Sequence, residues 1–145
     1  MTEVVIVTHV TAIAVLVGII WTVQLVHYPM LAAVAPERFA AAHADHSRAI
    51  TAVVALPWAL EGVTTLWLVV APPVGVPRWL VGLGALAAAV PVVVTLVASV
   101  PAHARLSAGF DLGVHARLVA TNRWRTLGWT AHGAIAIAIL ARSSG

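Results

Sequence analysis

Four polar side chains recur along one face of the last apolar stretch of the chain. They are Asn122, Arg125, Trp129 and His132, and at about 100° per residue they fall within roughly 80° of one another on a helix. An amide, a guanidinium, an indole and an imidazole on one stripe could bind an oxygen-rich group and move a proton. Polar groups at membrane depth are costly and usually turn toward the protein interior. The spacing therefore predicts an inward-facing polar stripe.

A carboxylic acid in a second apolar stretch is the expected partner of this stripe. Glu61 is about 17 Å along a helix from Ile50, and His132 is about 13 Å from Arg123, so both should lie at a similar depth. In an enzyme we expect Glu61 and His132 to handle protons and Arg125 to bind Glu61 or an anionic ligand, which makes these three the predicted catalytic residues. A glutamate that only fixes helix packing is the alternative.

Aromatic and amide side chains beside these faces predict a ligand pocket. Tyr28 and Gln24 share one face near the end of the first apolar stretch, and the indoles could line a pocket for an apolar or aromatic ligand. The predicted ligand-binding set is Gln24, Tyr28, Trp58, Asn122 and Trp129. Core packing is the alternative role for any one of the tryptophans. His9 is expected to be a packed or interfacial histidine, apart from this set.

Histidines are expected to gather near one membrane surface. His43 and His46 are three residues apart on one helix face, and His103 should lie at the same level. Imidazoles at this spacing can share a metal, so these three are the predicted ligands of a metal or haem. The intervening Asp45 and the following Arg48 fit a solvated helix equally well, and this alternative stays open.

Four apolar runs must position these residues. Each is long enough to cross a bilayer, which takes about 20 helical residues, and the runs are Val4–Val26, Ile50–Ala71, Trp79–Val100 and Trp124–Ala141. The last run is the shortest, and a three-span chain with this run at the membrane interface is the alternative. The sequence shows no obvious internal repeat. We predict an all-α, integral membrane four-helix bundle that forms a single domain over residues 1–145.

The connections between the runs are unequal. Three prolines within residues 72–77 predict a tight turn between the second and third spans. Pro36 and Glu37 suit a first helical turn, and Asp111 suits an N-cap. We therefore expect spans two and four to begin outside the bilayer, in the cytoplasm, and span two to kink near Pro57.

Composition restricts the class of protein. The chain has 145 residues, of which 61% are hydrophobic and 9% charged, whereas a soluble domain has about a quarter charged residues. Cysteine is absent, which excludes disulfides and thiolate ligands. No block of basic residues with interleaved aromatics predicts nucleic-acid binding. The composition is typical of a protein whose main surroundings are the lipid bilayer.

Arginine placement predicts the orientation. Two arginines, Arg78 and Arg142, lie on the side of the tight turn and the termini. The side with the long connections carries Arg38, Arg48, Arg105, Arg117, Arg123 and Arg125. Because positive residues are retained inside, we expect the long connections in the cytoplasm and both termini outside the inner membrane.

Five short motifs spread over nearly the whole chain also carry a resemblance. They are Gln24–Pro29, His43–Arg48, Pro57–Glu61, Pro101–His103, and Asn122 with Arg125, Thr126 and Trp129. Together they resemble small bacterial four-span membrane proteins of uncharacterised function. The resemblance implies the topology and no activity.

A more distant resemblance rests on the last span. The spacing of Asn122, Trp129 and His132, with a polar residue after Trp21 in the first span, is similar to the anthrone oxygenase-like membrane family. That resemblance implies cofactor-poor oxidation of polycyclic aromatics. Gly133 follows His132, and no full motif of the family is matched.

These patterns favour a small membrane oxidoreductase, or a lipophile-binding protein, whose ligand is membrane-soluble and aromatic or quinone-like. A non-enzymatic role is the competing class: a component of a proton-coupled transporter, a small channel or a membrane assembly partner. Transport would predict a homo-oligomer, because a chain this short builds a permeation path by symmetric association.

Overall fold

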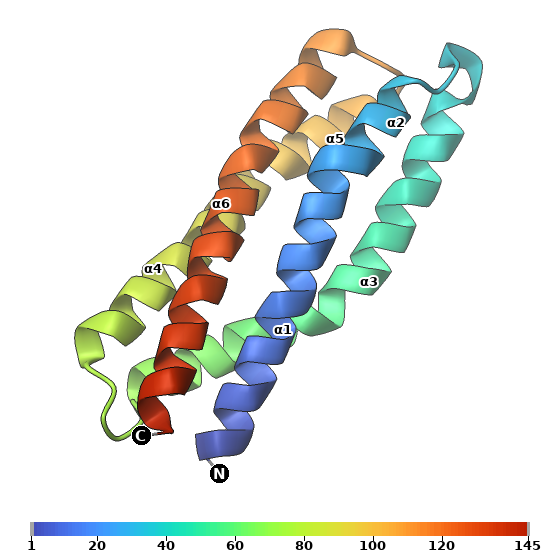
Figure 1. Ribbon diagram of the computed structural model, residues 1–145. Coiled ribbons are helices and arrows are strands. Elements are labelled where there is room, and N and C mark those ends of the chain that lie inside the picture. The colour runs from blue at the N-terminus through green and yellow to red at the C-terminus, as the bar shows by residue number, and fades with distance from the viewer. Residues whose placement is uncertain (1, 145) are drawn as a thin grey trace.

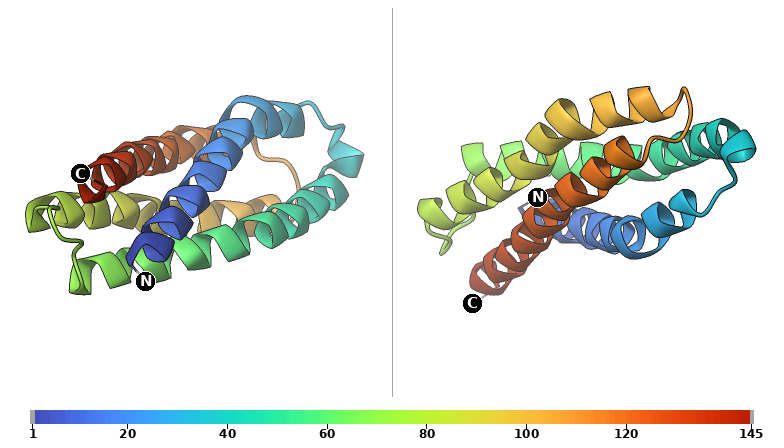
Figure 2. Two further views of the ribbon diagram at one scale, coloured as in Figure 1. Left: turned by 60° about the horizontal axis from the view of Figure 1, so that its bottom comes forward. Right: turned by 90° about the horizontal axis from the view of Figure 1, so that it is seen from above.

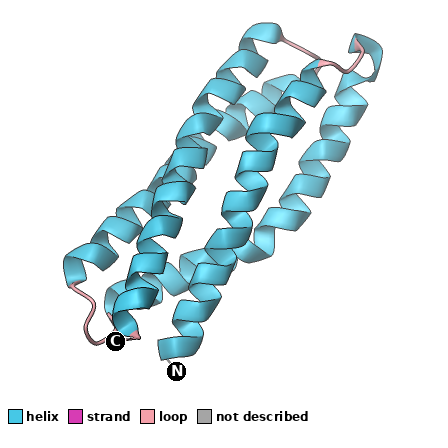
Figure 3. Ribbon diagram, in the orientation of Figure 1, coloured by secondary structure: helices cyan, strands magenta, loops and turns pink. Residues whose placement is uncertain are grey.

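The protein is a bundle of four helical rods that run up and down antiparallel to one another. The computed structural model describes residues 2–144, and all regular structure among them is helical. Both termini lie at one end of the bundle (Figure 1), and short loops join the rods (Figure 3). In chain order the elements are α1 (Thr2–Thr22), η1 (Val23–His27), α2 (Tyr28–Ala32), α3 (Pro36–Val70), α4 (Arg78–Val94), η2 (Thr95–Ser99), α5 (Val100–Leu106) and α6 (Leu112–Ser143). The predicted all-α four-helix bundle is confirmed.

The rods pack in a square. The first rod, α1 to α2, packs against α3 and α6, and the third rod, α4 to α5, packs against the same two helices. The helices α3 and α6 therefore face each other across the centre of the bundle, as the view from above in Figure 2 shows. Side chains that meet between α3 and α6 lie at the centre of the protein.

The long helices begin where the local chemistry predicts. Pro36 occupies the first turn of α3, and the side chain of Asp111 caps α6 by accepting a hydrogen bond of 2.9 Å from the backbone N–H of Val114. The helix α3 continues through Pro57 to Val70. Both helices thus extend beyond their apolar runs. Whether these extensions lie in the cytoplasm stays a prediction.

Two π-helical turns, each shortly before a proline, were not predicted from the sequence. Pro29 and Pro101 each lie two residues after a π-helical turn, η1 and η2. A proline has no N–H to donate to the preceding turn, and the helix adjusts by taking in an extra residue. The backbone N–H of Tyr28 accordingly bonds to the carbonyl of Val23, five residues earlier. Such π turns occur frequently at functional sites.

The structure also contains an internal repetition. The order of helix, π turn, proline, short helix, loop and long helix occurs once in each half of the chain. His43 follows Pro29 at the same separation as His115 follows Pro101. Nε2 of His43 lies 3.0 Å from Nδ1 of His103, and Nε2 of His115 lies 3.0 Å from the carbonyl oxygen of Tyr28. The long helices α3 and α6 thus each place a histidine in contact with the other half of the chain.

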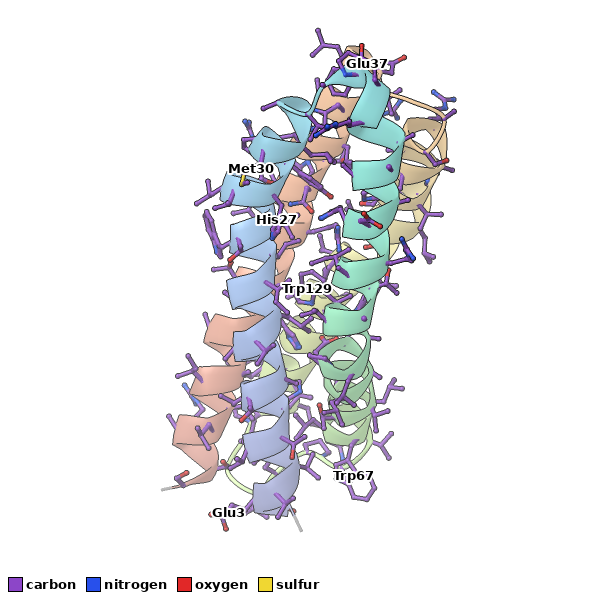
Figure 4. All side chains as sticks on the ribbon, turned by 90° about the vertical axis from the view of Figure 1, so that its right-hand side faces the viewer. Glu3, His27, Met30, Glu37, Trp67 and Trp129 are labelled. Carbon is purple, nitrogen blue, oxygen red and sulfur yellow. The ribbon has the colours of Figure 1, made fainter. Side chains whose placement is uncertain are left out.

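The outer surface is largely apolar. The continuous helices Thr2–Ala32, Pro36–Val70 and Arg78–Leu106 are each long and apolar enough to cross a membrane. Met30 and Trp67 point outward, whereas Trp129 points into the bundle (Figure 4). The helix α6 is less apolar because it carries four arginines, Arg117, Arg123, Arg125 and Arg142, together with buried polar side chains such as Asn122 and His132. The predicted fourth span, Trp124–Ala141, therefore stays a prediction.

Candidate functional site

A cavity of about 270 Å³ lies beside the two π turns. Residues from every helical element except α4 line it, so both halves of the chain contribute. Most of its wall is aliphatic and aromatic, as at Leu16, Ile20, Val54 and Trp58. Its polar lining consists of Tyr28, His46, Ser47, Thr51, Thr95, Ser99, His103 and Arg125. An apolar enclosure with a few polar groups is the usual form of a small-molecule site.

The guanidinium of Arg125 is held in this cavity by neutral groups. Its Nη1 donates a hydrogen bond of 3.1 Å to Oδ1 of Asn122, and its central carbon lies 5.3 Å from the ring centroid of Trp129. Nδ2 of Asn122 donates in turn to Oε1 of Gln24, at 2.9 Å. Within residues 2–144 two acid–base contacts lie within salt-bridge distance, the ion pair of Arg48 with Asp45 and the carboxyl–imidazole pair of Glu61 with His132, and neither includes Arg125. Among residues 2–144 the cavity therefore holds a cation with no carboxylate partner, and the ionisable group beside it is the hydroxyl of Tyr28.

Other polar atoms around the cavity also lack partners. Ser47 Oγ, Ser99 Oγ, Arg125 Nε and Trp129 Nε1 are buried and make no hydrogen bond to any residue that the structure describes. All four residues line the cavity. Because buried polar groups in proteins are nearly always hydrogen-bonded, this concentration indicates a place that a polar group of a ligand, or water, completes.

The predicted ligand-binding residues divide into two roles. Tyr28, Trp58 and Trp129 line the cavity, and the two indoles pack edge to face with their centroids 5.5 Å apart. Gln24 and Asn122 do not line it and stand behind Arg125 as a chain of hydrogen bonds. Their contacts orient the guanidinium.

A second polar centre lies across the middle of the bundle. Oε1 of Glu61 is 3.0 Å from Nε2 of His132, and both side chains are 2% exposed. The hydroxyl of Thr65 is 3.5 Å from the same ring nitrogen. The ring of His9 packs edgewise on His132 at 5.1 Å, and its Nδ1 lies 2.8 Å from the hydroxyl of Thr64. Three helices, α1, α3 and α6, thus converge on one buried carboxyl–imidazole pair.

The structure does not bring together the three predicted catalytic residues. Glu61 and His132 meet, but the polar neighbours of Arg125 are Asn122, one turn closer to the start of α6, and Tyr28. Arg125 and His132 are separated by two helical turns, about 10 Å. Long side chains on a helix lean toward its N-terminus, which directs Arg125 away from His132. Arg125 therefore belongs to the cavity and not to the central pair.

His9 and Thr64 are the functional candidates that the sequence analysis missed. Both are buried in the central polar group. His9 is the eighth residue of α1 counted from Thr2, and Glu61 lies nine residues before Val70, the last residue of α3, at the same end of the bundle. Measuring the depth of all polar residues from that common end would have placed His9 beside Glu61.

The predicted metal ligands lie close together in pairs. Nε2 of His43 faces Nδ1 of His103 at 3.0 Å, and the ring of His46 lies 6.3 Å from that of His103. His43 stacks on Phe39, while His46 and His103 line the cavity. Within residues 2–144 no group of three or more His, Asp or Glu side chains is arranged to hold a metal ion. This arrangement does not support a metal ion held by three side chains, and the haem site stays a prediction.

Comparisons with protein-family models, with curated proteins and with solved structures find no match to this chain. The resemblances drawn from its motifs therefore stay expectations.

Proposed function

We propose that the protein is an integral membrane protein that binds a small lipophilic molecule in the cavity beside Arg125, through an anionic or oxygen-rich group of the ligand. Three helices long and apolar enough to cross a membrane support insertion, as do the many large apolar side chains on the outer surface. The arginine asymmetry favours an inner-membrane orientation with both termini outside.

The absence of an acid around Arg125, among the residues described, carries the proposal. A charged side chain at the bilayer centre is penalised by about 3 kcal/mol on insertion scales, and removal of one partner from a buried pair costs about 3–5 kcal/mol. A fixed guanidinium with neutral protein partners is therefore suited to an acceptor that comes from outside. Guanidinium groups bind carboxylates with two parallel hydrogen bonds, which would also satisfy the free Nε.

The rest of the cavity suits the apolar part of such a ligand. Aliphatic side chains and the Trp58–Trp129 pair form its walls, and its volume of about 270 Å³ is near the lower limit of roughly 300–1,000 Å³ for small-molecule pockets. The polar groups of Tyr28, His46 and His103 face the same space. These groups would allow proton exchange with a quinone-like ligand, which is the oxidoreductase form of this proposal.

Thermal unfolding in detergent tests the proposal with three twelve-carbon probes at submicellar concentration. The anion dodecanoate should raise the unfolding temperature more than the neutral dodecan-1-ol or the cation dodecyltrimethylammonium, because a ligand that binds only the folded state stabilises it. The substitution Arg125→Gln should abolish the advantage of the anion.

Arg123→Gln is the matched control. Arg123 is two residues away on the same helix and exposed, so its loss should leave the advantage of dodecanoate intact. Equal effects of the three probes on the wild type, or equal losses in the two variants, would overturn the proposal.

The central pair supports a second candidate, a component of a proton-coupled transporter. Glu61, His132 and His9 form a buried, protonatable group that joins three helices at membrane depth. In liposomes with a pH-sensitive dye inside, a proton carrier would give a flux that Glu61→Gln abolishes. A wild-type flux no faster than that of empty liposomes would remove this candidate.

A further inference from the structure

A second hollow of about 510 Å³ lies on the outer surface between α1 and α3. The residues that line only this groove are Ala14, Val15, Gly18, Thr22, His27, Ala49 and Val53. Figure 4 looks onto this face, with His27 at the end of η1 and Trp129 deeper between the first rod and α3. Four residues line both the groove and the cavity, namely Ile19, Val23, His46 and Ile50. The two spaces are therefore neighbours that share one wall.

We propose that this groove holds a single hydrocarbon tail of the ligand whose polar group binds beside Arg125. The inference rests on the proposed function and names its ligand class: a single-chain amphiphile with an anionic or oxygen-rich head. Such a ligand enters sideways from the bilayer, between α1 and α3, and need not pass through water.

The chemistry of the groove is complementary to that of the cavity. Its lining is almost entirely apolar, and its one hydroxyl, Thr22, donates a hydrogen bond of 2.9 Å to the carbonyl of Gly18. No groove-only residue has a buried polar atom without a partner among the residues described, whereas the cavity has four. Of the two spaces, the cavity alone is thus lined by buried polar atoms without partners among the residues described, and the groove suits a hydrocarbon chain.

The shape of the groove also suits a tail. It follows the first rod from Ala14 to His27, about 20 Å along a helix and parallel to the direction that lipid chains take. A Cβ added at Gly18 would meet no other atom within 4 Å, so the glycine leaves the groove open at its middle. At the end nearest the π turns, the rings of His27 and His46 lie 5.4 Å apart and mark where the apolar path ends.

The test compares two carboxylates that differ in tail length, hexanoate and dodecanoate, by their effect on the unfolding temperature in one detergent. In the wild type, dodecanoate should bind at least tenfold more tightly than hexanoate. Gly18→Leu should fill the groove, weaken dodecanoate about tenfold and leave hexanoate unchanged. The matched control is Gly82→Leu, because Gly82 is also an exposed helical glycine with nothing within 4 Å of its added Cβ, and it lines neither space.

The outcomes distinguish a failure of the tail proposal from a failure of the headgroup site. If Gly18→Leu binds both acids as the wild type does, the tail proposal is overturned and the headgroup site stands. If the wild type shows no carboxylate-dependent stabilisation, the proposed function fails and the tail proposal fails with it. Should Gly18→Leu not fold, Ala49→Leu fills the same groove from α3.

A photocrosslink gives a second, independent readout. The residue p-benzoyl-phenylalanine at Val53, which lines the groove, should attach to dodecanoate, and at Val63, which lines neither space, it should not. The Val53 crosslink should disappear in Arg125→Gln, because the head no longer holds the tail in place. Equal crosslinking at the two positions, or attachment of bilayer lipid only, would contradict the proposal.

Discussion

The central pair predicts a specific pattern of energetic coupling. Glu61 and His132 are in contact at 3.0 Å with both side chains almost completely buried, whereas Arg125 contacts neither of them through any described hydrogen bond or ion pair. A change at Glu61 should therefore alter the effect of a change at His132. The effect of a change at Arg125 should be independent of Glu61.

The magnitude follows from the burial of the pair. Leaving one member of a buried pair without its partner costs about 3–5 kcal/mol. Glu61→Gln keeps the shape of the side chain, so we expect it to cost less than Glu61→Ala. For the pair Glu61→Gln and His132→Gln we expect a coupling energy of about 2 kcal/mol, within the range of about 0.5–3 kcal/mol for residues in contact.

Two double-mutant cycles on the free energy of unfolding in detergent measure these terms. The first combines Glu61→Gln with His132→Gln, and the second combines Glu61→Gln with Arg125→Gln. The reasoning is refuted if the first cycle is additive within about 0.5 kcal/mol. It is equally refuted if the second cycle gives a coupling above about 1 kcal/mol, since that would place Arg125 in the central pair.

Two further predictions concern packing and orientation. A Cβ at Gly128 would lie 2.8 Å from Cδ of Pro91, so Gly128→Ala should destabilise the α4–α6 contact by about 1–3 kcal/mol. Gly62→Ala should be neutral or stabilising, because an added Cβ there meets no atom within 4 Å. Equal unfolding free energies of the two variants would contradict this. The chain has no native cysteine, so Ser144→Cys should react with a membrane-impermeant reagent on intact cells and Ser107→Cys should not. Labelling at position 107 alone would reverse the orientation.

The architecture was predictable because its signals are local. Apolar runs of span length, the proline turn at residues 72–77 and the cap at Asp111 each act over a few residues, and the structure confirms four helices in which α3 and α6 extend beyond their apolar runs. The inward polar faces were also predictable, since Asn122, Trp129 and His132 share a helical stripe and are all buried.

The partners within the bundle were not predictable from helical periodicity. Periodicity gives a face and a depth, whereas contacts depend on which helices oppose each other and on the direction of each side chain. Arg125 and Glu61 both face inward, yet the lean of Arg125 along α6 takes it to Asn122. The π turns beside Pro29 and Pro101 also shift the register of the residues that follow them, including His103. A straight-helix projection cannot include that shift.

The distance between a bound carboxylate and Arg125 tests the central claim most directly. In lipid bilayers, solid-state NMR can measure the dipolar coupling between dodecanoate labelled with ¹³C at its carboxyl carbon and protein labelled with ¹⁵N at its arginine side chains. We expect a coupling that corresponds to direct hydrogen bonds, with N–O distances of about 2.7–2.9 Å, and its loss in Arg125→Gln but not in Arg123→Gln. A carboxylate that shows no such coupling, or that keeps it in Arg125→Gln, would contradict the assignment of this cavity as the binding site.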